Sequence, residues 1–446
     1  MDAYTLQWIL VIGISIVLFF LAPLAKTEEA FFKGEGASGK PNFWVLTSSL
    51  VISWLFAKSI TNAANLGLSY GLVGGVAYAG YYLSFVVAGL IIYKLRTQGG
   101  FTSIHHFLQS KFGKGALIIF SLLIAFRLLN EVWSNAMVIG SYFGEEGSAP
   151  YLSAVVVFTI LTIAYTIKGG MSSSLFTDVI QMVLFGVLLM IILLMIFPKT
   201  DWDIPAFVQS GTWSMSQGVN LLLLAILQSF SYPFHDPVLT DRGFVTDAKT
   251  TRTSYLWAAV MGALCIIFFS FVGIYGQMEG VTGQAPVEVA KLFGIPMMLL
   301  MNFIMITSAA STLDSTFSSF SKLVHLDLKL AKASLTGGRI SMIVIALIGT
   351  IPVFFNPEII SATTVSGTMV IGLAPIFLFW NYKVPAVSFY LSVVGGFLFA
   401  LLCLFFPLPD YLLFSEGKYA DLLAVNCYGT VLCFFLFLCP KLFWSK

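Results

Sequence analysis

Charged side chains are scarce in this sequence. Aspartate, glutamate, lysine and arginine together make up 10% of its 446 residues, whereas hydrophobic residues make up 58%. A soluble globular domain carries about 25% charged residues, so the composition excludes a soluble fold. The mean hydropathy of +0.92 agrees with this conclusion. The sequence therefore predicts an all-α polytopic membrane protein, whose immediate environment is the lipid bilayer.

Histidine, cysteine and phosphate-binding motifs are also scarce or missing. The four histidines and five scattered cysteines form no metal-binding motif and no disulfide framework. No GxxxxGK[ST] pattern occurs, so ATP-driven pumping is not expected. The net charge of +2 gives no indication of nucleic-acid binding. Any active transport must then draw on an ion or solute gradient, and we expect no enzymatic activity.

Apolar stretches predict about 13 transmembrane helices. They cover 5–24, 43–70, 74–94, 115–141, 151–167, 174–197, 217–235, 254–276, 289–325, 339–355, 359–380, 385–406 and 421–441. Lysine and arginine gather in alternate loops, Arg242 among them, and the intervening loops are acidic. The positive-inside rule then places the N-terminus outside and the C-terminus in the cytoplasm. The expected location is a plasma membrane, such as the bacterial inner membrane.

One of these spans carries a stripe of hydroxyl side chains. Between residues 304 and 321 the sequence reads IMITSAASTLDSTFSSFS, with Thr307, Ser308 and Ser311 near one helical face. Each unsatisfied polar group in lipid costs several kcal/mol, so such a stripe needs polar partners. Hard oxygens without a soft ligand suit an alkali or alkaline-earth cation. The alternative is that the hydroxyls bond to helix carbonyls and line a close helix contact.

Five ionisable residues interrupt the predicted spans. They are Lys58, Arg127, Glu131, Asp178 and Asp314. Charges inside a membrane protein are candidates for function because they are costly to place there. Arg127 and Glu131 lie one helical turn apart, so they can also neutralise each other and serve structure alone. Asp178 could instead cap a helix or pair with cytoplasmic bases.

Two spans look discontinuous. The second, 43–70, mixes lysine, serine, threonine, asparagine and glycine into its middle, and the seventh, 217–235, runs into LQSFSYPFHDP. Pro233 and Pro237 remove backbone donors there. Broken helices at matching places in two halves of a chain indicate an inverted-repeat transporter with its site near the bilayer midplane. Proline kinks without any ligand are the alternative for each span alone.

Four motifs in this order resemble the sodium:solute symporter family. They are AKSIT in the second span, the GG at 169–170 followed by TDVIQ at 177–181, SYPFHDPVLTDR in the seventh span, and ITSAASTLDST in the ninth. Together they cover roughly residues 43–330. The resemblance implies a LeuT-like fold with a 5+5 inverted repeat. Residues 43–380 would form the core, with repeats at about 43–197 and 217–380, and 1–42 and 381–446 would be peripheral.

The resemblance also implies ion and solute sites. The main sodium site would fall on the carbonyls of Ala57, Ile60 and Ile304 and on the hydroxyls of Thr307 and Ser308. A second sodium, present in some members, would use Asp178 with Thr307 and Ser311. A small-molecule substrate would lie against Thr61, Asn62, Ala64, Asn65, Gln228, Ser229 and the gate aromatic Tyr232. Arg127 would face the same pocket, which makes an anionic, carboxylated solute the first candidate.

The function implied is sodium-coupled symport by alternating access. Two residues depart from the family pattern. Lys58 lies beside the implied sodium site, so it could replace the cation and make the protein a sodium-independent uniporter or a proton symporter, unless it pairs with an acid such as Asp314. His235 could couple protons, although cytoplasmic water is its more favoured setting. A non-transporting solute sensor is the third alternative, which an end at Lys446, just after the last span, disfavours.

Overall fold

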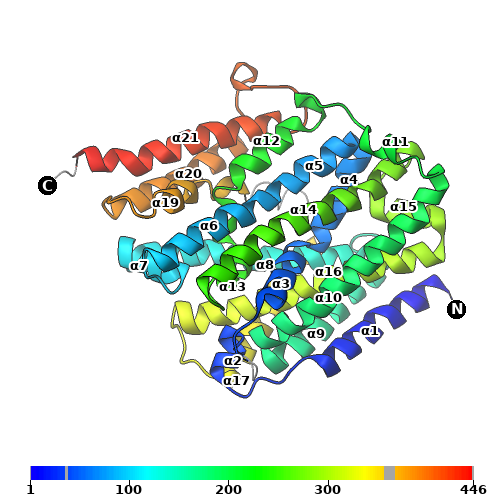
Figure 1. The fold of residues 1–446 in the computed structure, drawn as a ribbon, viewed down its shortest axis with the longest axis horizontal. Helices are drawn as coiled ribbons and strands as arrows, with labels where there is room; N and C mark the ends of the chain where they lie inside the picture. The colour runs from blue at the N-terminus through cyan, green and yellow to red at the C-terminus, as the bar shows by residue number, and fades with distance from the viewer. Residues whose placement is uncertain (1, 36–38, 356–366, 444–446) are drawn as a thin grey trace.

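The computed structural model describes residues 2–35, 39–355 and 367–443, and the fold in this part of the chain is helical (Figure 1). The longer helices are α1 (Ala3–Leu21), α3 (Phe43–Trp54), α4 (Ala57–Tyr70), α6 (Leu83–Thr97), α8 (Lys114–Gly140), α9 (Ala149–Gly169), α10 (Met171–Ile196), α12 (Val219–Gln228), α14 (Ala248–Met278), α16 (Ile295–Lys322), α17 (Leu335–Thr350), α20 (Val387–Phe405) and α21 (Ala420–Phe443). The shorter ones are α2 (Glu28–Lys33), α5 (Leu72–Ala79), η1 (Gly80–Tyr82), α7 (Ile104–Phe112), η2 (Phe197–Thr200), α11 (Ile204–Val208), η3 (Met215–Gln217), η4 (Tyr232–His235), α13 (Pro237–Arg242), α15 (Ala285–Phe293), η5 (Leu323–Asp327), η6 (Ile351–Phe355), α19 (Leu373–Leu378) and η7 (Asp410–Leu412).

Membrane-length helices dominate the described residues. Ten are long and apolar enough to cross a bilayer, and α3 with α4 makes an eleventh, bent by 60°. Two of the 13 predicted spans are not among these: 217–235 contains the ten-residue α12, and part of 359–380 lies outside the described residues. The count of 13 therefore stays a prediction. The start of α1 and the end of α21 lie at opposite ends of the molecule (Figure 1).

The second predicted span is broken, as its polar composition indicated. α3 ends at Trp54 and α4 begins at Ala57, with no glycine or proline between them. A helix end leaves backbone groups unsatisfied, and in a membrane they must find partners inside the protein. The Tyr82 hydroxyl donates to the Trp54 carbonyl at 2.9 Å, and the Ser308 hydroxyl donates to the Leu55 carbonyl. Neighbouring helices therefore stabilise this break.

The seventh predicted span is broken as well. α12 ends at Gln228, the short helix η4 follows, and α13 begins at Pro237. Proline at the first position of α13 has no backbone donor to leave unsatisfied. The Asp236 side chain caps this helix by accepting from the Leu239 amide at 3.2 Å. The same carboxylate also faces α3 and α8, so the cap ties the second broken helix to the first.

The ninth predicted span, 289–325, is divided in the structure. α15 ends at Phe293, and α16 begins at Ile295. Gly294 between them has φ +77°, a left-handed conformation that glycine adopts without steric cost. The span predicted at 289–325 is therefore two helices, because a stretch of apolar residues hides a single glycine turn.

α14 occupies the middle of the molecule and packs against α3, α4, α5 and α6 (Figure 1). Its contact with α4 depends on glycine. A Cβ on Gly273 would lie 1.7 Å from the Ala64 carbonyl oxygen, and a Cβ on Gly67 would lie 2.2 Å from the Ser270 carbonyl oxygen. Small residues allow membrane helices to approach this closely. α16 packs against α8, α10 and α17.

The predicted peripheral segments lie at opposite edges of the bundle. α1 runs along one edge beside α9, and α20 and α21 pair at the other (Figure 1). The assignment of residues 43–197 and 217–380 as two inverted repeats stays a prediction.

Candidate functional site

The break between α3 and α4 lies directly against the hydroxyl stripe of α16. The last carbonyls of α3 have no partner within the helix, and the Leu55 carbonyl is met by the Ser308 hydroxyl of α16. Both residues are fully buried. A helix end that presents a carbonyl to a hydroxyl of a neighbouring helix is the type of oxygen pair that binds a hard cation.

The other residues predicted for the main sodium site lie around this point. Thr307 and Ile304 are buried in α16, and the Thr307 hydroxyl donates to the Phe303 carbonyl at 2.8 Å. Ala57 and Ile60 lie inside α4, where helix geometry engages their carbonyls. The Ala57 carbonyl also accepts from the Thr61 hydroxyl at 3.0 Å. The carbonyls that turn to neighbouring helices are those of Trp54 and Leu55, just before the break. The assignment of Ala57 and Ile60 to the sodium site stays a prediction.

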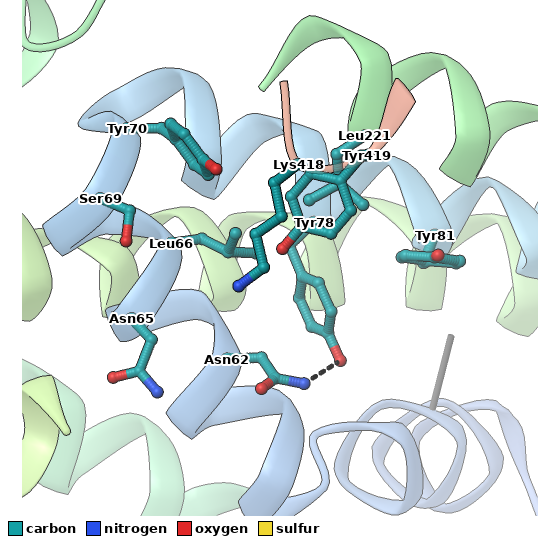
Figure 2. A pocket seen from close by; sticks show the side chains of 10 residues that line it. All are labelled: Asn62, Asn65, Leu66, Ser69, Tyr70, Tyr78, Tyr81, Leu221, Lys418 and Tyr419. Carbon is teal, nitrogen blue, oxygen red and sulfur yellow. Dashed lines mark hydrogen bonds between the residues drawn. The ribbon is translucent and has the colours of Figure 1, made fainter. Parts of the chain in front are cut away.

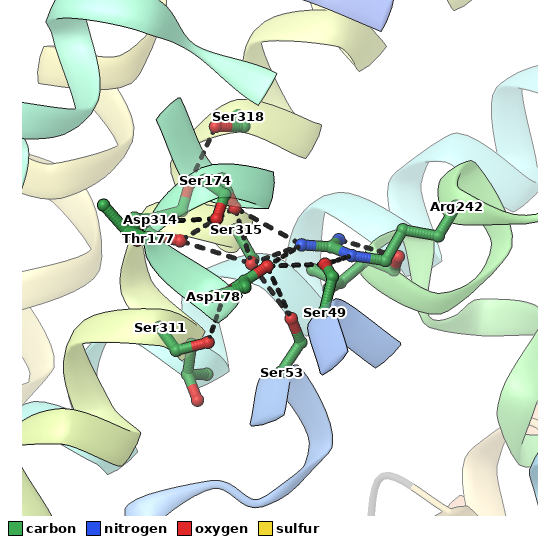
Figure 3. A network of polar contacts seen from close by, with 12 residues as sticks. Ser49, Ser53, Ser174, Thr177, Asp178, Arg242, Ser311, Asp314, Ser315 and Ser318 are labelled. Atoms are coloured by element: carbon green, nitrogen blue, oxygen red, sulfur yellow. Dashed lines mark hydrogen bonds and ion pairs between the residues drawn. The ribbon is translucent and has the colours of Figure 1, made fainter. Parts of the chain in front are cut away.

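Asp178 is the centre of a second polar cluster, on α10. Its carboxylate accepts from the hydroxyls of Ser49 and Ser311, each at 2.5 Å, and from Ser53 at 3.5 Å. The Arg242 guanidinium of α13 lies 2.9 Å from the same carboxylate (Figure 3). The structure brings Ser311 to Asp178 as predicted, whereas Thr307 is turned to the Phe303 carbonyl. A guanidinium thus occupies one side of the proposed second sodium site.

The prediction that Arg242 is a base of a cytoplasmic loop was wrong. Its side chain is fully buried and contacts Ser49, Ser174 and Ser315 in addition to Asp178. The sequence contained a signal: a lone carboxylate within a span requires a compensating cation. Arg242 ends the motif SYPFHDPVLTDR, where the two prolines return the chain into the protein.

A chain of four charges links α4, α8 and the capped end of α13. The Lys58 ammonium lies 2.8 Å from Glu131, which also pairs with Arg127. Arg127 in turn lies 3.2 Å from Asp236. Two cations and two carboxylates balance, as buried charges must. Lys58 therefore pairs with Glu131 and not with Asp314, and its other contacts are the Asn130 oxygen at 3.3 Å and the Ser134 hydroxyl at 3.1 Å.

Two sequence interpretations change at this chain of charges. Arg127 is 1% exposed and is engaged by two carboxylates, so it does not offer a free guanidinium to an anionic solute. His235 is 2% exposed, and its Nδ1 lies 2.5 Å from the Tyr232 carbonyl. The expectation that this histidine sits in water was wrong, because η4 turns back into the protein.

A cavity of about 70 Å³ lies beside the C-terminal half of α4 (Figure 2). The residues around it are Asn62, Asn65, Leu66, Ser69, Tyr70, Tyr78, Tyr81, Leu221, Lys418 and Tyr419. A second space of about 20 Å³, with room for about one water, adjoins Tyr232 and Trp54. Tyr78 and Tyr81 line both spaces. Of the predicted substrate residues, Asn62, Asn65 and Tyr232 line these cavities.

The remaining predicted substrate residues have other contacts. Ala64 packs against Gly273 of α14, and Ser229 donates to the Ala225 carbonyl at 2.8 Å. Gln228 receives the Tyr81 hydroxyl at 3.0 Å and donates to Asn426 of α21 at 3.0 Å. Sequence reasoning missed the tyrosines, which line the cavity from α4, α5 and the loop before α21. Aromatic residues are frequent throughout the chain, so nothing in the sequence singled these out.

Comparison with known proteins identifies relatives of part of the chain. No protein-family model matches it. Sodium/glucose cotransporter 4 of Danio rerio is 25% identical over 167 residues, 36% of this chain and 25% of that protein. An uncharacterized symporter, YwcA of Bacillus subtilis, is 21% identical over 291 residues, 60% of this chain and 55% of that protein. The matched region thus spans about a quarter of the first relative and about half of the second.

Solved structures cover the whole fold. A Na⁺-coupled sialic acid symporter in a substrate-bound outward-open state aligns over 99% of this chain and 98% of that one, with a TM-score of 0.73 and 17% identity. MhsT in complex with L-phenylalanine aligns over 89% and 98%, with a TM-score of 0.56 and 16% identity. These findings confirm the resemblance drawn from the four motifs: the chain has the LeuT fold and is similar in sequence to the sodium:solute symporters.

Proposed function

We propose that this protein is a sodium-coupled symporter of a small organic solute that works by alternating access. The observation that carries the proposal is the Ser308 hydroxyl placed on the Leu55 carbonyl, at the break of the second span. Sodium would take the Leu55 carbonyl and the oxygens of Ser308 and Thr307. The Thr307 hydroxyl already donates its proton to Phe303, which leaves its lone pairs for a cation.

The relatives support this proposal. Those that match part of the chain include sodium/glucose cotransporters, and one structural neighbour that aligns over nearly the whole chain is a Na⁺-coupled symporter. A cation bound between α3, α4 and α16 would hold the broken helix in one arrangement. Such a ligand shifts a conformational equilibrium only by its different affinity for the two states.

The asymmetry of the molecule also supports alternating access. On one side of the break, ion pairs join Arg242 to Asp178 and Arg127 to Asp236, and the rings of Phe234 and Phe377 stack at 3.9 Å. On the other side lies the cavity of Figure 2. With the orientation predicted from the basic loops, the closed side faces the cytoplasm and the cavity faces outward.

The sodium site is tested by thermal unfolding of the purified protein in sodium and in potassium. A ligand present at 100 times its dissociation constant stabilises the native state by about 2.7 kcal/mol. We expect sodium to raise the unfolding temperature of the wild type and of Ser318→Ala, but not that of Ser308→Ala. Ser318 is the matched control because its hydroxyl bonds to the Asp314 carbonyl on the same helix, at 2.8 Å. An equal sodium effect in Ser308→Ala would contradict the proposed site.

The sodium-independent alternative depended on the charge of Lys58. Because the Lys58 ammonium binds Glu131 within a balanced set of four charges, it adds no net positive charge beside the break. The thermal test distinguishes the two proposals, since a sodium-independent transporter would show the same unfolding temperature in both salts.

We further propose that Lys418, and not Arg127, senses a negatively charged solute. Lys418 lines the cavity together with Asn62 and Asn65, and its side chain extends towards both amides (Figure 2). No carboxylate pairs with it among the described residues. The amides and tyrosine hydroxyls of this cavity supply hydrogen bonds for the rest of a polar solute.

A binding screen of small metabolites tests this proposal. An exposed ion pair contributes about 0.5–1 kcal/mol. Lys418→Gln should therefore weaken the binding of a carboxylated solute by about two- to five-fold, and leave that of its neutral amide unchanged. Arg127→Gln is unsuitable as a comparison because it breaks buried ion pairs. If Lys418→Gln weakens both solutes equally, the residue does not sense charge.

A further inference from the structure

The cluster around Asp178 contains a second carboxylate whose charge has no direct partner. Asp314 of α16 is fully buried and lies beside Ser174, Thr177 and Ser315 (Figure 3). Arg242 pairs directly with Asp178 and reaches Asp314 only through the hydroxyls of Ser174 and Ser315. Two carboxylates therefore share one guanidinium. An uncompensated buried charge costs several kcal/mol, and such a group takes up a proton instead.

The hydroxyl groups around the carboxyl group can accommodate a proton on it, because several of them have a second acceptor within reach. Its Oδ1 accepts from Ser174 at 2.8 Å and from Ser315 at 3.3 Å, and both hydroxyls also face Arg242. Its Oδ2 lies 2.8 Å from the Tyr165 hydroxyl and 3.0 Å from the Thr177 hydroxyl. Oδ1 is thus surrounded by donors that the guanidinium polarises, which suits the carbonyl oxygen of a carboxylic acid.

The two hydroxyls beside Oδ2 have other acceptors. The Tyr165 hydroxyl lies 3.1 Å from the Ala310 carbonyl, and the Thr177 hydroxyl lies 2.9 Å from the Ser173 carbonyl. A hydroxyl has one proton to donate, and a backbone carbonyl can only accept. When each hydroxyl donates to its carbonyl, the contact between Oδ2 and Tyr165 needs a proton on the carboxyl group.

A buried amide lies next to this group. Gln181, on α10, is fully buried within interaction range of the Tyr165 hydroxyl, although neither its Oε1 nor its Nε2 makes a hydrogen bond of ordinary geometry in the described structure. An amide can donate or accept. The Gln181 amide can therefore serve the Tyr165 hydroxyl in either direction. It can do so when that hydroxyl donates to Asp314 and when it accepts a proton from Asp314.

We propose that Asp314 is a proton-binding site between α9, α10 and α16. The charged and titratable groups that face it are Tyr165 on α9, Asp178 on α10 and Arg242 on α13. Lys322, two turns further along α16, pairs with Asp241 and Asp327 and does not compensate Asp314. Direct contacts of 2.8–3.0 Å between Oδ1 or Oδ2 and three hydroxyls leave no space for a metal cation between them. A proton needs no such space.

Protonation of Asp314 would support the closed arrangement of the cluster. With the acid neutral, Arg242 is free to pair with Asp178 and to join α3, α10 and α13. With the acid ionised, the two carboxylates compete for one guanidinium, and the proton has left for water. This consequence for transport rests on the proposed function, whereas the protonation itself does not.

Infrared spectroscopy of the purified protein, without solute, tests the proposal independently of transport. At neutral pH we expect the carbonyl stretching band of a buried carboxylic acid. Asp314→Asn should abolish this band and remain folded, because an amide resembles the neutral acid. Asp178→Asn should weaken the band, because Asp314 can then give up its proton and balance Arg242 through Ser174 and Ser315. Asp314→Glu should keep the band at a shifted frequency.

Two results would overturn the proposal. The first is a wild-type spectrum at neutral pH without a carboxylic acid band that responds to Asp314→Asn or Asp314→Glu. The second is loss of sodium-dependent thermal stabilisation in Asp314→Asn, which would make this carboxylate a ligand of sodium.

Discussion

Removal of the Arg242 guanidinium should destabilise the protein more than removal of its partner Asp178. Arg242→Gln leaves the Asp178 carboxylate buried with serine hydroxyls alone, and breaking a buried ion pair in this way costs about 3–5 kcal/mol. Asp178→Asn leaves Arg242 with Ser174 and Ser315, and through them with Asp314. Asp314 can then give up its proton and balance the guanidinium, so we expect a smaller cost.

The double variant Arg242→Gln with Asp178→Asn isolates the charge effect. It contains no unpaired charge at this pair and loses mainly hydrogen bonds, which contribute about 1 kcal/mol each. We therefore expect it to be more stable than Arg242→Gln alone, with a coupling energy of about 1–3 kcal/mol. Arg252→Gln is the matched control, because Arg252 lies over the Tyr93 ring and makes no ion pair among the described residues.

Unfolding in detergent, followed by tryptophan fluorescence, measures these differences at a fixed pH. A difference of 1.4 kcal/mol changes the ratio of folded to unfolded protein about tenfold, well within reach of the assay. If the costs of the two single changes simply add in the double variant, Arg242 and Asp178 do not act as an ion pair. If Arg242→Gln is no more harmful than Arg252→Gln, the reasoning about buried charge fails.

Two further predictions concern the chain of four charges and the packing of α4 against α14. Glu131→Gln should destabilise the protein more than Lys58→Met, because Glu131 compensates both Lys58 and Arg127. The double variant should be more stable than Glu131→Gln alone, and thermal unfolding of the three variants tests this order. Gly273→Ala should lower the unfolding temperature, since its methyl group would lie 1.7 Å from the Ala64 carbonyl oxygen. Gly13→Ala should leave the unfolding temperature unchanged, because no atom lies within 4 Å of a Cβ at that position. Equal unfolding temperatures for the two variants would contradict the close packing of α4 and α14.

The fold class, the two broken helices and the polar contacts of the hydroxyl stripe on α16 could be predicted from the sequence for physical reasons. Hydrophobic length indicates a span, and polar residues with proline in the middle of a span indicate a break. The exact position of the first break was beyond sequence reasoning. No proline or glycine marks it, and the groups that stabilise it, Tyr82 and Ser308, come from distant helices.

The hydroxyl stripe shows the same limit. Some hydroxyls bond to carbonyls of their own helix, as one interpretation expected: those of Thr307, Thr312 and Ser318. Ser308 and Ser311 instead face the break and Asp178, and the cation site stays a prediction. Spacing along a helix shows which residues share a face. It does not show which of them has a carbonyl or a carboxylate opposite, because that depends on how the helices pack.

The charges inside the membrane were only partly paired correctly. The expected pairing of Arg127 with Glu131 is confirmed, whereas Lys58 was offered Asp314 as partner and Arg242 was placed in a loop. The structure gives Lys58 to Glu131 and Arg242 to Asp178. Charge balance requires that partners exist, and only the three-dimensional arrangement of α4, α8, α10 and α13 decides which they are.

The most direct test of sodium-coupled symport is uptake into proteoliposomes of a solute found in the binding screen. An inward sodium gradient should drive accumulation that an equal potassium gradient does not, and an inside-negative potential of about 100 mV should add about 2.3 kcal/mol, or roughly fifty-fold, for each sodium ion carried. Ser308→Ala should reduce the sodium-driven component. Equal uptake with either cation, insensitive to the membrane potential, would contradict the proposed coupling.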